Sequence, residues 1–180
     1  MLKTIDNFLS LKDFLSIQKM LKGEDQKFPW YFQKTIYEYD SHASPEFMFF
    51  HLFNNDNKAN SSFNDYLKPF YKKVYETFPY SSVVRCKANL YTNKGKSMTH
   101  GPHQDLSHLK KPFPYMSAIY HINKCNGATV IDDKQKNIFK KFSQKENRLI
   151  IFSGNTTHYA VTQTNTPFRF IINLVIKQSI

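Results

Sequence analysis

After Pro79 the chain contains six short segments rich in β-branched and aromatic residues, and turn-forming stretches separate them. The segments are SSVVRCKANLY (81–91), YMSAIYHIN (115–123), ATVID (128–132), NRLIIF (147–152), THYAVTQ (157–163) and FRFIINLVIK (168–177). The turns between them include TNKGKS, NKCNG, SGNTT and TNTP. Short strands in such number, without helices between them, favour an antiparallel double-sheet jelly roll or a barrel.

The N-terminal part has a different, helical pattern. Residues 10–23 (SLKDFLSIQKMLKG) place apolar side chains near a 3.6-residue period, which predicts a helix that begins at Ser10 as N-cap and ends at Gly23. Residues 61–79 predict a second amphipathic helix, and Pro69 is expected to kink it.

Between these helices, the aromatic-rich residues 30–40 and 46–53 predict two strands, and residues 54–62 predict a polar loop. The 180 residues suffice for one domain with a core and are too few for two ordinary ones. We therefore expect a single, mainly β domain with N-terminal helices. Residues 1–79 would form a helical and aromatic wrapper with outer strands, and residues 80–180 would form the jelly-roll core.

The net charge of +11 suggests nucleic acid as a partner, but the distribution of the charge weakens this interpretation. Only three of the 25 basic residues are arginines, which leaves 22 lysines. The lysines are spread along the chain and form no single stripe. A solvated lysine surface is the favoured interpretation, and nucleic-acid binding stays open.

Location and cysteine content narrow the class of protein further. No apolar run approaches the roughly 20 residues that a membrane helix needs. The N-terminus shows no signal-peptide pattern, so a cytoplasmic protein is expected. Cys86 and Cys125 are too few for a disulfide scaffold and lack zinc-ribbon spacing.

The stretch HGPHQDLSHLKKPF (100–113) holds the strongest chemical signal. His103 and Asp105 are two residues apart, so on a strand both side chains point to one face. His158 follows in a later predicted strand. Two imidazoles and one carboxylate form the facial triad that leaves three coordination positions open on Fe(II). A structural zinc site would need a fourth protein ligand.

Arg169 adds a second element to this pattern. The strands 157–163 and 168–177 are expected to form a hairpin around TNTP, which places Arg169 about two residues along the ladder from His158. At ~3.3 Å per residue the separation is roughly 7 Å. A five-carbon dicarboxylic acid fits this gap, with one end on the metal and the other carboxylate in a forked pair with Arg169.

With these residues in place, the chain resembles the Fe(II)/2-oxoglutarate-dependent oxygenases, in particular the prolyl-hydroxylase-like branch of small bacterial and phage enzymes. The pieces that carry the resemblance are KANLY, HGPHQD, SAIYHIN, NRLIIFSGNTTHYAVTQT and FRFIINLVI, within residues 85–177. The resemblance implies a double-stranded β-helix, or jelly roll. It also implies that His103, Asp105 and His158 are the catalytic iron ligands, and that Arg169 binds the distal carboxylate of 2-oxoglutarate.

Further co-substrate contacts are implied by the same resemblance. Asn89 and Tyr91 match an N-x-Y pattern that touches 2-oxoglutarate in related enzymes. Asn173 lies on the same strand face as Arg169, and His121 occupies a position where some relatives have tyrosine. Purely structural alternatives stay open: a surface-paired arginine at 169, core residues at 89 and 91, and an ordinary core or surface histidine at 121.

The remaining histidines carry less signal. His100 is three residues from His103 and so would lie on the opposite strand face. We expect His100 and His108 to be rim residues, with substrate contact as the alternative, whereas the sequence around His42 and His51 carries no functional signal.

The resemblance also implies the chemistry and the partners. Fe(II), 2-oxoglutarate as co-substrate and dioxygen would be required, with ascorbate as a stimulant, and oxidation of a second substrate would be coupled to decarboxylation of 2-oxoglutarate. A protein or peptide side chain such as proline is the favoured substrate, and a phage-encoded enzyme would act in the host cytoplasm. One alternative is a nucleic-acid demethylase, whose branch usually carries a second arginine six residues after the first. Val175 stands there. Another is a non-catalytic, cupin-like binding module, which a complete triad argues against. Residues 106–116 and the 54–62 loop would form the rim over the iron.

Overall fold

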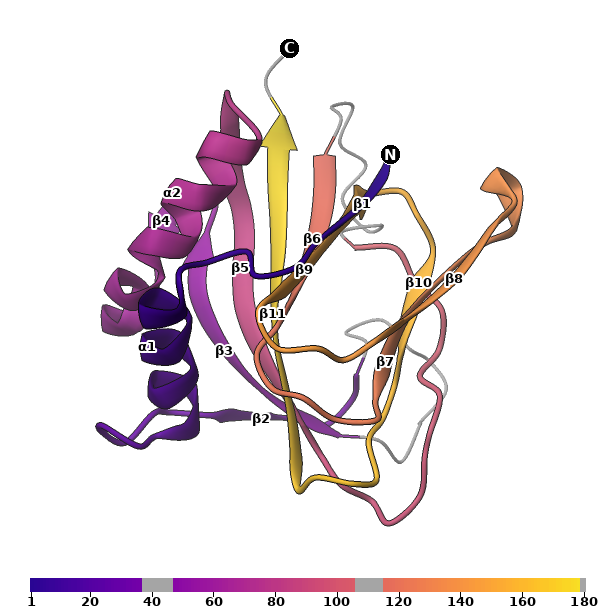
Figure 1. Ribbon diagram of the computed structural model, residues 1–180, viewed down its shortest axis with the longest axis horizontal. Coiled ribbons are helices and arrows are strands. Elements are labelled where there is room, and N and C mark those ends of the chain that lie inside the picture. Colours follow the sequence, from indigo (N-terminus) through magenta and orange to yellow (C-terminus); the bar gives the residue numbers. More distant parts are fainter. Residues whose placement is uncertain (37–46, 106–114, 179–180) are drawn as a thin grey trace.

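The computed structural model describes residues 1–36, 47–105 and 115–178 of the chain. In this described part, two antiparallel sheets face each other, and two α-helices cover the outer face of the larger sheet (Figure 1). The larger sheet has eight strands. In spatial order they are β1 (Leu2–Ile5), β9 (Arg148–Ser153), β6 (Tyr115–His121), β11 (Phe168–Gln178), β5 (Ser81–Thr92), β3 (Met48–Asn55) and β2 (Tyr31–Gln33), with β4 (Lys58–Ala59) paired to β3.

The smaller sheet consists of β10 (His158–Val161), β7 (Ala128–Asp133) and β8 (Ile138–Ser143) in that order. Residues 98–103 extend it beyond β10. The Thr162 amide donates to the Met98 carbonyl and the His100 amide donates to the Ala160 carbonyl, both at 2.9 Å. From β5 onward the chain passes repeatedly between the two sheets, so the jelly roll expected from the sequence is confirmed.

The first helix forms as predicted. Helix α1 spans Leu11–Lys22, the Ser10 hydroxyl accepts a hydrogen bond from the Asp13 amide, and Gly23 ends the helix with a φ of 70°. The left-handed conformation explains why glycine stands at this position.

The second predicted helix is divided into two. A 3₁₀ helix, η1 (Ser62–Leu67), precedes α2 (Lys68–Thr77). Pro69 lies in the first turn of α2 rather than inside a continuous helix. Proline is tolerated there because the first amides of a helix have no intrahelical partner, so Pro69 marks a helix start and not a kink.

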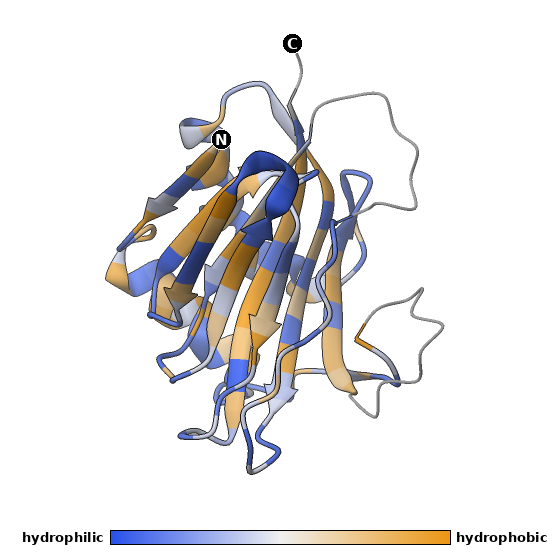
Figure 2. Cartoon of the chain, turned by 90° about the vertical axis from the view of Figure 1, so that its right-hand side faces the viewer, coloured by the Kyte–Doolittle hydropathy of each residue, from blue (hydrophilic) through white to orange (hydrophobic). Residues whose placement is uncertain are grey.

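Two apolar layers hold the fold together. One lies between the helices and the outer face of the larger sheet, and it includes Phe14, Ile17, Leu21, Phe70 and Tyr120. The other lies between the two sheets, and it includes Met48, Tyr91, Ile119, Ile131, Phe142, Ile150, Phe152 and Ile171. Full burial of each large apolar side chain contributes about 1.5–3 kcal/mol. Figure 2 shows hydrophilic bands crossing the otherwise hydrophobic strands.

Several details differ from the sequence-based expectations. Strands β1 and β8 were not predicted, and the 54–62 loop contains the end of β3 and the short β4. Asp56 and Asn57 both have positive φ, 48° and 60°, as in a two-residue hairpin turn. The predicted strands at 30–40 and 46–53 are seen as β2 and β3, and residues 37–46 lie outside the described part. In the described residues, no helix is long and apolar enough to cross a membrane.

The predicted hairpin between residues 157–163 and 168–177 is wrong. Strand β10 pairs with β7 in the smaller sheet, whereas β11 pairs with β5 and β6 in the larger one. The turn TNTP therefore joins the two sheets. A turn signal between two strands does not reveal whether the second strand returns to the same sheet.

Candidate metal and co-substrate site

Two histidines and one aspartate converge beside β10. His103, Asp105 and His158 each offer one ligand atom, and these atoms all lie within 4.8 Å of one another. Two backbone hydrogen bonds, of 3.0 and 2.9 Å, join His103 to His158, and the centroids of their imidazole rings are 4.4 Å apart. The structure thus brings together the three residues that the sequence predicts as metal ligands.

A β-bulge sets the direction of the histidines before Asp105. Three residue steps separate His100 from His103, but only two separate their partners Ala160 and His158. The extra residue changes the face on which a side chain lies. His100 is buried, and its ring centroid is 5.2 Å from that of Tyr91. The prediction that His100 is a rim residue is therefore wrong, because faces alternate only in an unbroken strand. His42 and His108 lie outside the described residues.

Backbone carbonyls orient the two imidazoles. His158 Nδ1 lies 3.1 Å from the Thr156 carbonyl oxygen, and His103 Nδ1 lies 3.4 Å from the Gly101 carbonyl oxygen. A ring nitrogen that faces a carbonyl carries the proton, so the other nitrogen, Nε2, holds the lone pair. His158 Nε2 is 3.7 Å from Asp105 Oδ2. Both rings are therefore disposed to offer Nε2 to a metal.

The protonation states also suit metal binding. Burial, with the neighbouring His158, lowers the pKa of His103 to about 4, so this imidazole is neutral at pH 7. Burial alone would raise the pKa of the Asp105 carboxyl, but His158, Arg85 and His103 hold it below its usual value. A neutral imidazole and an ionised carboxylate are the forms that coordinate metal ions.

The donor set fits Fe(II). Two imidazole nitrogens and one carboxylate leave three positions open for a co-substrate and dioxygen. Among the described residues, no fourth histidine, cysteine or acidic side chain joins His103, Asp105 and His158. The cluster therefore lacks the fourth ligand of a structural zinc site.

Arg169 lies fully buried on β11. Its Nε donates to Gln144 Oε1 at 3.0 Å, its Nη2 donates to Thr129 Oγ1 at 3.1 Å, and its Nη1 has no hydrogen-bond partner. Burial lowers the pKa of the guanidinium, which nevertheless stays charged at pH 7. No acidic side chain of the described residues pairs with it. The alternative of a surface-paired arginine is excluded, and a buried cation of this kind calls for an anionic ligand.

Thr129 connects Arg169 to His121. Its hydroxyl oxygen lies 3.3 Å from His121 Nε2, and the Lys145 amide donates to His121 Nδ1 at 3.3 Å. His121 Nε2 therefore carries the proton and donates to Thr129. Burial, with the charge of Arg169, holds the pKa of His121 well below its usual value. Since the Thr129 oxygen accepts from both neighbours, its own hydrogen is available to a bound anion.

The distance between the two halves of the site follows from the smaller sheet. Thr129 pairs with Ala160, and Ile131 pairs with His158, so Thr129 and His158 are two residue positions apart. At ~3.3 Å per residue this is about 7 Å. The two-residue offset predicted between His158 and Arg169 on a β10–β11 hairpin is therefore not found. The observed offset is between His158 and Thr129, the hydrogen-bond partner of Arg169, across β7 and β10.

Asn89 and Tyr91 lie in the interior beside Arg169. Tyr91 pairs with Arg169 in the β5–β11 register, and its ring centroid is 5.5 Å from the guanidinium carbon. The Asn89 amide donates to the Tyr91 hydroxyl at 3.3 Å, while Asn89 Oδ1 is buried without a partner. Tyr91 also packs in the apolar layer between the sheets. Both residues are thus near the expected co-substrate position, and their contact with it stays a prediction.

Asn173 is on the Arg169 face of β11, as expected, but its amide reaches Asp105, one of the candidate metal ligands. Asn173 Nδ2 lies 3.3 Å from Asp105 Oδ2 and 3.5 Å from Oδ1. This geometry fits a role of Asn173 in holding Asp105 better than a contact with 2-oxoglutarate.

The sequence interpretation missed three residues of the site. Arg85 donates to Asp105, and Thr129 and Gln144 hold Arg169. Arg85 could have been identified from the sequence, because it lies four residues before Asn89 on the same predicted strand and therefore on the same face. Thr129 and Gln144 had no such signal, because their roles depend on which strands face each other.

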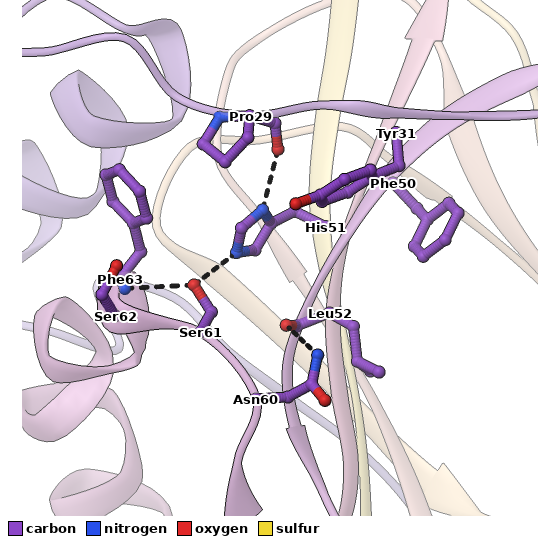
Figure 3. A pocket seen from close by; sticks show the side chains of 9 residues that line it. All are labelled: Pro29, Tyr31, Phe50, His51, Leu52, Asn60, Ser61, Ser62 and Phe63. Carbon is purple, nitrogen blue, oxygen red and sulfur yellow. Dashed lines mark hydrogen bonds between the residues drawn. The ribbon is translucent and has the colours of Figure 1, made fainter.

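A separate pocket of about 390 Å³ lies next to β3 and η1 (Figure 3). It is lined by Pro29, Tyr31, Phe50, His51, Leu52, Asn60, Ser61, Ser62 and Phe63. His51 Nδ1 is 2.8 Å from the Pro29 carbonyl oxygen and Nε2 is 2.7 Å from Ser61 Oγ. Both ring nitrogens are therefore engaged within the protein, which supports a structural role for His51. None of the metal-ligand candidates lines this pocket.

Comparison with known proteins supports the fold assignment. No protein-family model matches the chain, and no curated protein matches its sequence. A 2OG-Fe(II) oxygenase family oxidoreductase from Burkholderia pseudomallei matches with a TM-score of 0.73 and 12% identity, over 99% of this chain and 85% of that chain. The chain therefore shares its fold with a 2OG-Fe(II) oxygenase.

Two further structures share the fold and differ in substrate. A Trichoplax adhaerens prolyl hydroxylase, in complex with a hypoxia inducible factor oxygen degradation domain peptide fragment, matches with a TM-score of 0.67 and 13% identity, over 98% of this chain and 82% of that chain. SnoN, a non-heme alpha ketoglutarate dependent epimerase from nogalamycin biosynthesis, matches with a TM-score of 0.65 and 12% identity, over 98% and 77%. The fold thus accommodates more than one substrate class.

Proposed function

We propose that this chain is an Fe(II)/2-oxoglutarate-dependent dioxygenase that hydroxylates a C–H bond of a second substrate. The observation that carries the proposal is the pairing of His103, Asp105 and His158 with the buried Arg169, whose Nη1 has no partner. Three metal ligands alone fit many metalloproteins. A buried guanidinium whose partner Thr129 is about 7 Å along the sheet from His158 adds a binding group for the distal carboxylate of a dicarboxylic co-substrate. The shared fold supports the same assignment.

Each part of the chain has a definite role in this proposal. Fe(II), when bound, would supply the redox chemistry that couples decarboxylation of 2-oxoglutarate to oxidation of the substrate. His103, Asp105 and His158 would hold it and leave three positions open. Arg169 would pair with the distal carboxylate, and the Thr129 hydroxyl would donate to the same group. The apolar layer between the sheets would exclude water from the reacting groups.

The substrate we favour is a protein or peptide side chain, such as proline. Support comes from the prolyl hydroxylase of the same fold, which is in complex with a peptide. The scattered lysines give less support to nucleic acid as the substrate. Val175 is weaker evidence against demethylation than the sequence alone suggested, because Arg85 lies opposite it in the β5–β11 register. Nucleic-acid demethylation is therefore the second candidate.

One experiment separates these candidates. Peptide and methylated-oligonucleotide pools are incubated with the protein, Fe(II), ascorbate and 2-oxoglutarate and analysed by mass spectrometry, with His103→Ala as the control. Gain of one oxygen atom by peptides, absent in the control, is the expected result. Loss of methyl groups from oligonucleotides without a peptide product would favour the demethylase. A protein that binds metal and 2-oxoglutarate but forms no succinate with any pool would be a non-catalytic binding module.

A further inference from the structure

Arg85 reaches from β5 to the carboxylate of the candidate metal ligand Asp105. Its Nη2 donates to Asp105 Oδ1 at 3.0 Å and to Asn173 Oδ1 at 3.4 Å. The side chain of Arg85 is 18% exposed and that of Asp105 only 4%, so the ion pair is largely shielded from water. A shielded, charge-assisted hydrogen bond fixes geometry more firmly than an exposed one.

The two carboxylate oxygens of Asp105 have different neighbours. Asp105 Oδ1 accepts the hydrogen bond from Arg85, whereas Oδ2 lies toward His158, 3.7 Å from its Nε2. Asn173 Nδ2 is within 3.5 Å of both oxygens and is a second side chain that restricts rotation of the carboxylate.

A second arginine in the same chain shows the contrasting arrangement. Arg148 forms a bidentate ion pair with Asp6 at the surface. Its Nε donates to Oδ1 at 2.6 Å and its Nη2 donates to Oδ2 at 3.0 Å, so both carboxylate oxygens are occupied. Arg85 instead uses one nitrogen on one oxygen of Asp105. A fork would compete with a metal for the carboxylate, whereas a single contact leaves one oxygen for the metal.

We propose that Arg85 is a positioning residue of the metal site. It holds Asp105 in the orientation that presents Oδ2 to the metal beside the two imidazoles, and it fixes Oδ1 away from the metal. This inference rests on the proposed function, since it requires that the three ligands bind a metal. Groups that hold a metal ligand in place commonly affect metal affinity by about 10- to 100-fold.

The test compares Arg85→Gln, Arg85→Lys and the wild type, with Arg148→Gln as the matched control. Co(II) affinity is measured by calorimetry without 2-oxoglutarate, and the visible spectrum of the Co(II)-saturated protein reports the ligand geometry. We expect Arg85→Gln to bind Co(II) about 10- to 100-fold more weakly than the wild type and to show an altered spectrum. Arg85→Lys should recover part of the affinity, and Arg148→Gln should match the wild type.

The outcomes distinguish this inference from the proposed function. Stoichiometric Co(II) binding by the wild type, with equal affinity and an identical spectrum in Arg85→Gln, would overturn the role of Arg85 and leave the metal site intact. Failure of the wild type to bind Co(II) would overturn both. If Arg85→Gln does not fold, Arg85→Lys carries the test: at least threefold weaker binding supports the role, and unchanged binding rejects it.

Discussion

Removal of the Arg169 guanidinium should weaken 2-oxoglutarate binding while metal binding survives. The side chain is fully buried, and Nη1 is the nitrogen without a partner in the protein. Loss of one partner from a buried, hydrogen-bonded charge pair costs about 2–5 kcal/mol. Since each 1.4 kcal/mol is a factor of ten, Arg169→Met should bind 2-oxoglutarate roughly 30- to 4,000-fold more weakly. Arg169→Lys, which keeps the charge but not the fork, should lie between Arg169→Met and the wild type.

Calorimetric titration of 2-oxoglutarate into Co(II)-loaded protein measures this effect without turnover. A Co(II) titration of the same variants shows whether the metal site is intact. Arg148→Met is the matched control, because Arg148 pairs with Asp6 at the surface and should leave 2-oxoglutarate affinity unchanged. If Arg169→Met retains stoichiometric Co(II) and binds 2-oxoglutarate within threefold of the wild type, Arg169 does not hold the co-substrate.

Three further predictions follow from the same interior. A Cβ at Gly127 would lie 2.9 Å from Arg169 Cδ, so Gly127→Ala should displace the arginine. In the same titrations, this variant should bind 2-oxoglutarate more weakly and Co(II) as tightly as the wild type. Equal 2-oxoglutarate affinity would show that the Arg169 side chain moves aside without loss of its binding geometry. A Cβ at Gly154 would overlap the ring of Tyr115, so Gly154→Ala should lower the midpoint of thermal unfolding, and an unchanged midpoint would contradict this close packing. The pKa of His121 is lower in the folded protein than in the unfolded chain, so below about pH 6.5 the unfolded state takes up a proton that the folded state does not. The metal-free protein should therefore lose unfolding free energy as the pH falls from 7 to 5, by up to about 1.4 kcal/mol per pH unit for this histidine. Urea unfolding of His121→Gln should show a shallower loss, and an identical pH dependence would exclude a buried neutral imidazole.

The parts of the fold that could be predicted depend on local sequence. Helix α1 begins at Ser10 and ends at Gly23 because capping and left-handed turns depend on a few adjacent residues. The composition of the segments after Pro79 predicts the strands. The two-residue spacing of His103 and Asp105, together with His158 in a later strand, supports the metal hypothesis without knowledge of the sheet order.

The parts that could not be predicted depend on contacts between distant strands. A single extra residue before His103 turns His100 into the interior. Gly101 and Pro102 in this stretch are typical of a bulge, but they do not show which residue is the extra one. Thr129 and Gln144 acquire their roles only when β7 and the end of β8 face Arg169. The β10–β11 hairpin gave His158 the wrong neighbouring strand, because the two-residue offset lies between His158 and Thr129, across β7 and β10.

Succinate formation is the most direct test of the central claim that this chain is an Fe(II)/2-oxoglutarate-dependent dioxygenase. Wild type, His158→Ala, Arg169→Met and Arg148→Met are incubated in air with Fe(II), ascorbate, 2-oxoglutarate and the peptide pool, and succinate is quantified. We expect succinate from the wild type and Arg148→Met, none from His158→Ala, and from Arg169→Met only at 2-oxoglutarate concentrations far above those that saturate the wild type. No succinate from the Fe(II)-loaded wild type, or equal amounts from wild type and His158→Ala, would contradict the claim.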